Sequence, residues 1–356
     1  MATNPQTGRV TLQTVAEAAG VHRSTASRAL NPLETKRVGD QTVSRVRMVA
    51  QQLGYEPHPW ARSLRTNRTL TIGLLIPRLT DVVLAGMFEA AADRAREHGY
   101  QAVTVSTGEQ EGVSRQLVEG LLDRRVDGLI LATATLEDPL ADELQEQGVP
   151  FVLMNRSSRD HLVVRGDDAL GGYLATKHLL AQGHDRIGFI AGALQTSTSH
   201  SRLEGYRRAH DGAGMAVDPA LIVPSSFGID GGIAAAGQLL SLDDPPTAIF
   251  AVNDATAIGA MATIRDLGLT VPTDLAMVGY NNTDVGQAFN VPLSSVAIPL
   301  QQMGRLAVDM LMARLAGDQP ESIVLPPRLI VRASSSWERA RTKHGSERQR
   351  VLPVAE

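Results

Sequence analysis

Residues 11–31 read TLQTVAEAAGVHRSTASRALN and divide at Gly20. Glycine allows the positive backbone angle that a tight turn between two helices needs. Apolar residues recur at helical spacing on both sides of it, as Leu12, Val15, Ala16 and Ala19 before the glycine and as Val21, Ala26, Ala29 and Leu30 after it. A third helix is predicted over residues 40–53, so this segment is typical of a helix-turn-helix unit.

The second predicted helix of this unit has a polar, basic outer face. Residues 21–31 hold two arginines, two serines, a threonine and no acidic residue. Arginine pairs well with guanine edges in the major groove, and hydroxyl groups suit DNA phosphates. This composition favours DNA contact over the alternative, which is the polar outer face of an ordinary helical hairpin.

The charge of the chain is divided unequally. The 356 residues carry a net charge of −4, but residues 1–68 contain ten Lys/Arg and four Asp/Glu, a net charge of +6. The remaining 24 basic and 34 acidic residues give the rest of the chain a net charge of −10. A basic segment on an acidic body predicts a polyanionic partner for that segment, with a solvated basic face as the alternative.

The composition is that of a globular protein with two or three domains, at 43% hydrophobic and 20% charged residues. The chain has no cysteine, which excludes thiol catalysis, disulfide bonds and cysteine-ligated metal. No run approaches the ~18 apolar residues of a membrane span. Residues 1–10 lack the basic-then-apolar pattern of an export signal, so we expect a cytoplasmic protein.

From Leu70 onward, short apolar runs alternate with amphipathic helices. The first series holds TIGLLIP, QAVTVS, VDGLILA and PFVLMN, and the second holds RIGFIAG, TAIFAVN and LAMVGYN, with a helix predicted near residues 201–213. Both series are typical of parallel βαβ units and predict two similar lobes. The chain then crosses back through SSVAI, a helix over residues 300–316, SIVLPP and RLIVRAS. The fold class is therefore α/β, behind an all-α N-terminal unit.

Polar residues follow several of these predicted strands. In open parallel sheets, ligands bind beyond the carboxyl ends of the strands, so these side chains are expected to converge on one cleft for a small polar molecule. For any one asparagine the alternative is a turn residue, and for Arg202 it is a salt bridge to a nearby carboxylate. The candidates that follow strands are Asn155, Asn253, Asp254, Asn281 and Asn282. The loop after RIGFIAG adds Ser197, Thr198 and Arg202, and Phe227 adds an apolar surface.

Enzyme signatures are not found. No GxGxxG follows the first predicted strand, and the chain contains no GxxxxGK[ST] and no HExxH. The histidines between His161 and His210 lack ligand-like spacing, so no metal and no cofactor are expected. Asp167 and Asp168 are predicted to cap the following helix rather than to form an acid pair. The tail, residues 337–356, has no leucine heptad and is expected to be disordered.

Residues 55–64, YEPHPWARSL, have the properties of a short hinge helix. Pro57 ends the preceding helix, and Pro59 suits a first helical position because its missing N–H needs no partner there. Trp60, Ala61 and Leu64 share one apolar face. A helix this short is marginal alone, so we expect it to form only when it packs against the same helix of a second copy of the chain and against DNA.

Together, VTLQTVAEAAGVHRSTASRALN and YEPHPWARSL resemble the headpiece and hinge of the lactose-repressor/galactose-repressor family of bacterial transcriptional regulators. The resemblance extends over about residues 10–335. It implies a DNA-binding headpiece (1–56), a hinge helix and linker (57–68), a two-lobe periplasmic-binding-protein-like effector and dimerisation domain (69–336) and a tail. The lobes would comprise residues 69–166 with 299–326, and 167–298 with 327–336.

The resemblance also implies residue roles. Leu64 would be a wedge inserted at the centre of a pseudo-palindromic operator, where it kinks the duplex. The implied DNA-binding residues are Arg23, Ser24, Thr25, Ser27, Arg28, Asn31, Tyr55, His58, Ala61 and Leu64. The implied effector-binding residues are Val83, Leu84, Asn155, Thr198, Arg202, Phe227, Asn253 and Asn281.

These observations predict a homodimeric repressor of a catabolic operon, controlled by a small molecule in the cleft. The alternatives are a cytoplasmic solute-binding protein without a regulatory role and a carbohydrate-active enzyme. Sugar-binding members of the family often have aspartate where this chain has Asn155 and Asn281, which would leave Arg202 without a partner. On that ground we expect a sugar acid as the effector. The alternative is a neutral sugar with Arg202 paired inside the protein, to Asp254 or Asp168.

Overall fold

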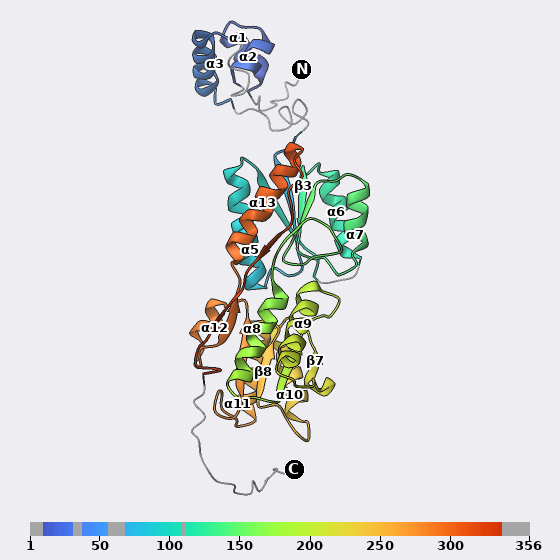
Figure 1. The fold of residues 1–356 in the computed structure, drawn as a ribbon. Coiled ribbons are helices and arrows are strands. Elements are labelled where there is room, and N and C mark those ends of the chain that lie inside the picture. Colours follow the sequence, from blue (N-terminus) through green and yellow to red (C-terminus); the bar gives the residue numbers. More distant parts are fainter. Residues whose placement is uncertain (1–9, 31–37, 56–67, 109–111, 337–356) are drawn as a thin grey trace, which may run out of the picture. The chain divides into compact units, whose positions relative to one another are not determined.

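The computed structural model describes residues 10–30, 38–55, 68–108 and 112–336 (Figure 1). The chain divides into two compact units, residues 1–70 and residues 71–356. Each unit is described by itself below.

The first unit is the predicted helix-turn-helix. Its helices are α1 (Leu12–Ala18), α2 (Arg23–Ala29) and α3 (Asp40–Gln52). The Thr11 side chain caps α1 in a capping box with Thr14, and Gly20 in the following turn has a φ of 63°. Small side chains let the helices approach closely around one core, which contains Val15, Ala16, Ala19, Ala26, Ala29, Val43, Val46 and Ala50.

The second unit contains two sheets, each covered by helices on both faces. The first sheet has the strand order β11-β5-β4-β3-β1-β2, and all of its pairings are parallel. Its strands are β1 (Thr71–Ile76), β2 (Gln101–Ser106), β3 (Gly128–Leu131), β4 (Phe151–Met154), β5 (Val163–Gly166) and β11 (Ile323–Leu325). Its helices are α5 (Val82–Glu97), α6 (Val113–Asp123), α7 (Pro139–Glu146) and α13 (Leu300–Ala316), and α13 packs beside α5 (Figure 1). We call this assembly the first lobe.

The second sheet has the order β12-β10-β9-β8-β6-β7, and only the β10–β12 pairing in it is antiparallel. Its strands are β6 (Ile187–Ala191), β7 (Ile222–Pro224), β8 (Ala248–Ala251), β9 (Ala276–Tyr280), β10 (Ser294–Ala297) and β12 (Arg328–Ile330). Its helices are α8 (Asp168–Ala181), α9 (Ser197–Gly212), the 3-10 turn η2 (Pro219–Leu221), α10 (Ile229–Leu240), α11 (Asp254–Asp266) and α12 (Asp284–Ala288). We call this assembly the second lobe.

The chain passes between the sheets after β5, after β10 and between β11 and β12. These crossings lie together. The backbone N–H of Asp167, after β5, donates to the carbonyl of Leu325 at 2.9 Å, and a Cβ added to Gly166 would lie 3.1 Å from Ile298. The two lobes are therefore joined by backbone segments that lie next to one another, which is the arrangement expected of a hinge between two lobes.

Two glycines allow the close packing of α8 against α9. A Cβ at Gly172 would overlap the carbonyl oxygen of Arg202, and a Cβ at Gly205 would overlap that of Ala169. The backbones of the two helices therefore touch. This contact fixes the start of α9 beside the start of α8.

The structure corrects the sequence interpretation in the second lobe. Helix α9 begins at Ser197, with Thr196 as its N-cap, and not near Ser201. Thr198 therefore lies in the first turn of a helix and not on the predicted loop, and Arg202 lies in its second turn. The short elements β5, β7 and α12 were not predicted. In the described part of the chain, no helix is long and apolar enough to cross a membrane.

Candidate functional site

Helix α2 presents a polar face to solvent. Ala26 and Ala29 are buried in the core of the first unit, whereas Arg23, Ser24 and Arg28 are exposed. Thr25 and Ser27 are half-buried beside them. The face that the sequence predicted for DNA contact is thus the outer face of a packed helix.

His22 caps α2. Its Nδ1 accepts a hydrogen bond from the backbone N–H of Ser24 at 3.3 Å and lies 2.7 Å from the Ser24 hydroxyl. This contact was not predicted, because histidine is not among the preferred N-cap residues.

Tyr55 packs half-buried against the core of the first unit, and burial raises the pKa of its phenol. Of the other predicted DNA-binding residues, Asn31, His58, Ala61 and Leu64 lie outside the described residues.

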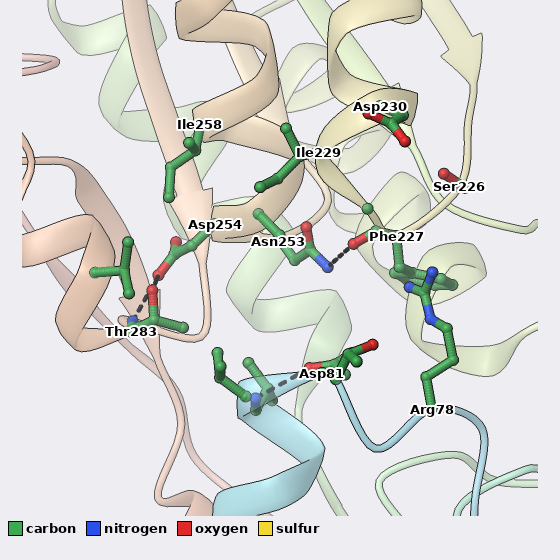
Figure 2. Close-up of a pocket in the computed structure, with 16 residues that line it drawn as sticks. Arg78, Asp81, Ser226, Phe227, Ile229, Asp230, Asn253, Asp254, Ile258 and Thr283 are labelled. Atoms are coloured by element: carbon green, nitrogen blue, oxygen red, sulfur yellow. Dashed lines mark hydrogen bonds between the residues drawn. The ribbon is translucent and has the colours of Figure 1, made fainter. Parts of the chain in front are cut away.

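A cavity of about 530 Å³ opens between residues of the two lobes (Figure 2). The first lobe lines it with the loop after β1 and the first turn of α5. Asp81 caps that helix, because its Oδ1 accepts hydrogen bonds from the N–H groups of Val83 at 3.0 Å and Leu84 at 3.4 Å. The second lobe lines it with residues from the starts of α10, α11 and α12. The lining residues are Arg78, Thr80–Val83, Ser226–Asp230, Asn253–Ala255, Ile258, Thr283 and Val285.

Asn253 is positioned by two contacts in this cavity. Its Oδ1 accepts from the N–H of Thr256 at 2.8 Å and caps α11, and its Nδ2 donates to the carbonyl of Phe227 at 2.9 Å (Figure 2). The amide therefore holds the Phe227 backbone against the start of α11. A ligand that bonded to this amide would have to share its remaining hydrogen-bonding capacity.

Asp254 is a buried carboxylate at the same wall. Its Oδ2 accepts from the N–H and hydroxyl of Thr283 at 2.6 and 2.9 Å, and its Oδ1 accepts from the Ser295 hydroxyl at 2.6 Å. Burial raises the pKa of Asp254, and these hydrogen bonds oppose that effect. Because the donors come from the segment that leads into α12 and from β10, Asp254 holds that part of the wall in place.

The predicted effector residues divide into two groups. Val83, Phe227 and Asn253 line the cavity, whereas Leu84, Asn155, Thr198, Arg202 and Asn281 are not among its lining residues. Asn155 and Asn281 have φ values of 68° and 93° directly after β4 and β9. Asparagine tolerates this left-handed region better than most residues, so the turn interpretation has direct support.

Arg202 has internal partners, so the expectation of an unpaired guanidinium is wrong. Both Arg202 and Asp168 are buried, and they form a salt bridge at 2.8 Å. Burial raises the pKa of the Asp168 carboxyl, and the neighbouring Arg202 charge opposes this. The sequence offered Asp168, Asp254 and the effector as alternative partners and could not choose among them, because the two members of the pair lie on different helices, α8 and α9. The expectation of an anionic effector rested on an unpaired Arg202, and this salt bridge removes that ground.

The sequence interpretation also missed several lining residues, among them Arg78, Asp81 and Asp230. Asp81 had an available signal, since an aspartate directly before the apolar run VVLAGMF is a typical N-cap. Within the described residues, no group of three or more His, Asp or Glu side chains has the arrangement of a metal site.

Two family models match the chain. Residues 11–58 match bacterial regulatory proteins of the lacI family, and residues 176–335 match a periplasmic binding protein-like domain. The first match covers the helix-turn-helix. The second covers most of the second lobe, together with α13 and β11 of the first lobe.

Similar proteins cover nearly the whole chain. The HTH-type transcriptional repressor PurR of Photobacterium profundum is 32% identical over 91% of this chain and 98% of its own length. The structure of a transcriptional regulator CelR–cellobiose complex is 33% identical, with a TM-score of 0.70 over 92% of this chain and 100% of that one. The structure of the lac repressor dimer bound to operator and the anti-inducer ONPF is 27% identical, with a TM-score of 0.82 over 92% of this chain and 99% of that one.

Proposed function

The chain belongs to the lacI family of bacterial regulatory proteins, and we propose that it is a homodimeric repressor of a catabolic operon controlled by a carbohydrate-like effector. The observation that carries the proposal is the outer face of α2, where Arg23, Ser24 and Arg28 are exposed over buried alanines. Family members are transcriptional regulators, so we propose no catalytic role. Because a repressor acts on chromosomal DNA, we propose that the protein is cytoplasmic and associated with the nucleoid.

The proposed DNA contacts follow from this face. Arg23, Ser24 and Arg28 read base edges in the major groove, and Thr25, Ser27 and Asn31 contact the backbone. Residues 57–68 form the hinge, in which Leu64 kinks the centre of a pseudo-palindromic operator, with Tyr55, His58 and Ala61 beside the DNA. The headpiece would end at residue 56 and the effector domain would span residues 69–336.

A dimer suits two operator half-sites and is supported by exposed apolar side chains in the lining of the cavity and beside it. Leu79, Val82, Ile229 and Val285 are exposed in the single chain. They come from both lobes, and a second copy packed there would remove them from water. The lac repressor, which this chain resembles, is a dimer in its operator complex.

The effector is proposed to bind in the cleft between the lobes. Val83, Phe227 and Asn253 contact it, and Leu84, Asn155, Thr198 and Asn281 extend the site. Because the charge of Arg202 is neutralised by Asp168, a neutral sugar replaces the sugar acid as the favoured class. The cellobiose complex of the similar CelR supports a carbohydrate.

The test is selection of an operator from a random duplex pool by the full chain, followed by binding assays with and without a panel of sugars. We expect enrichment of a two-fold symmetric sequence, an affinity that falls steeply with salt, and release by one sugar. A solute-binding protein would bind a sugar without enriching any DNA sequence. No enrichment, or an affinity that is independent of salt, contradicts the proposal.

A further inference from the structure

His22 and Ser24 interact at the start of the helix that faces DNA in the proposed function. The same atom, Nδ1 of His22, lies 3.3 Å from the backbone nitrogen of Ser24 and 2.7 Å from its hydroxyl oxygen. The backbone nitrogen is a donor, so Nδ1 must be an acceptor. The ring is therefore the neutral tautomer with its proton on Nε2.

This tautomer fixes the polarity of the second contact. Because Nδ1 carries no proton, the Ser24 hydroxyl must be the donor in the 2.7 Å hydrogen bond. A serine hydroxyl has one proton and two lone pairs. With its proton directed to His22, the exposed Ser24 hydroxyl has only acceptor capacity left for DNA.

We propose that His22 is a positioning residue that turns Ser24 into a hydrogen-bond acceptor, so that Ser24 selects adenine or cytosine in the operator. In the major groove, adenine N6 and cytosine N4 are donors, whereas guanine O6 and N7 and thymine O4 are acceptors. A hydroxyl whose proton is committed to His22 can accept from the first two bases and cannot donate to the others.

The neighbouring side chains have the opposite polarity. Arg23 and Arg28 carry only donors and are exposed on the same helix. They suit guanine, so α2 would present two donors and one acceptor to each half-site. Without the His22 contact, the Ser24 hydroxyl would rotate to suit any of the four bases.

The inference rests on the proposed function, and the experiment separates the two. An operator is first selected with the unmodified chain, and Ser24→Ala then identifies the base pair whose preference Ser24 controls. We expect adenine or cytosine at that position, preferred about fivefold over guanine or thymine on the strand that Ser24 faces. Failure to enrich any operator contradicts the proposed function, whereas an operator with guanine or thymine there overturns only this inference.

Two variants test the role of His22. His22→Gly removes the acceptor but keeps a residue that N-caps tolerate, so we expect the preference at that one base pair to fall within about twofold while the other positions stay unchanged. His22→Asn supplies an amide oxygen that caps the helix and accepts the hydroxyl proton, so it restores the preference. A His22→Gly protein that keeps the full preference overturns the inference, and so does a uniform loss of affinity across all positions.

Discussion

Asp168 Oδ1 accepts a hydrogen bond from Nε of Arg202 at 2.8 Å and forms a salt bridge with Nη2 of the same guanidinium, also at 2.8 Å. The remaining nitrogen, Nη1, donates to the carbonyl of Val252 at 2.6 Å, and the guanidinium carbon lies 3.6 Å from the centroid of the Tyr280 ring. Arg202 thereby holds α8, the end of β8 and the end of β9 together. Since Asp168 begins α8 directly after a crossing between the lobes, the pair links that crossing to the base of the second lobe.

Breaking this pair should destabilise the protein strongly. Arg202→Gln leaves a buried carboxylate without a counter-charge, and we expect the free energy of unfolding to fall by about 3–5 kcal/mol in urea titrations. Asp168→Asn should have a comparable effect.

The double variant, Arg202→Gln with Asp168→Asn, should lose less than the sum of the two single losses, because neither charge is then stranded. Arg96→Gln is a suitable control, since Arg96 pairs with Asp93 on the surface and its side chain is 75% exposed; its stability should match that of the parent. Strictly additive losses would mean that the two side chains act independently.

The helices and strands could be predicted where short sequence patterns determine them. Gly20 divides two apolar helical repeats, and the buried strands are short apolar runs that alternate with helices; both predictions are confirmed. The capping role of Asp167 is also confirmed, since its Oδ1 accepts from the N–H of Leu170 at 2.9 Å. These features depend on residues within a few positions of one another.

Features that depend on distant contacts were not predictable. The first turn of α9, Ser197–His200, is polar and resembles a loop, but its serines and threonine are buried. Strand β7 has three residues, which is too short for a periodic pattern. The partner of Arg202 lies on another helix, so the sequence left Asp168, Asp254 and the effector as alternatives.

The glycines between α8 and α9 should tolerate no side chain. Gly205→Ala would drive a methyl group into the backbone of α8, and we expect a loss of about 1–3 kcal/mol in unfolding free energy. Gly237→Ala is the matched control on α10, where a Cβ would meet nothing within 4 Å. That variant should gain about 0.5–1 kcal/mol, because alanine loses less entropy in a helix than glycine does. Equal effects of the two substitutions would contradict the close packing.

Asn281 offers a way to separate a turn residue from an effector residue. Its φ of 93° favours glycine, so Asn281→Gly removes the amide without straining the backbone. Under the proposed function, we expect this variant to fold like the parent and to need about fivefold more sugar for operator release. Asn281→Ala should in addition lose about 1–2 kcal/mol of stability. An unchanged sugar response in the glycine variant would make Asn281 a turn residue alone.

Arg28 tests how α2 reads DNA. It is exposed near the end of the helix, and its guanidinium suits two hydrogen bonds to guanine O6 and N7. Arg28→Ala should weaken binding to the selected operator by about 1–3 kcal/mol and relax the preference mainly at one base pair in each half-site. Binding to unrelated DNA should change little, because that binding depends on phosphate contacts. Competition assays against operators altered at single positions measure both effects. If all sequences are instead weakened equally and the salt dependence falls by about one unit of slope, then Arg28 contacts a phosphate and the base is read by another residue.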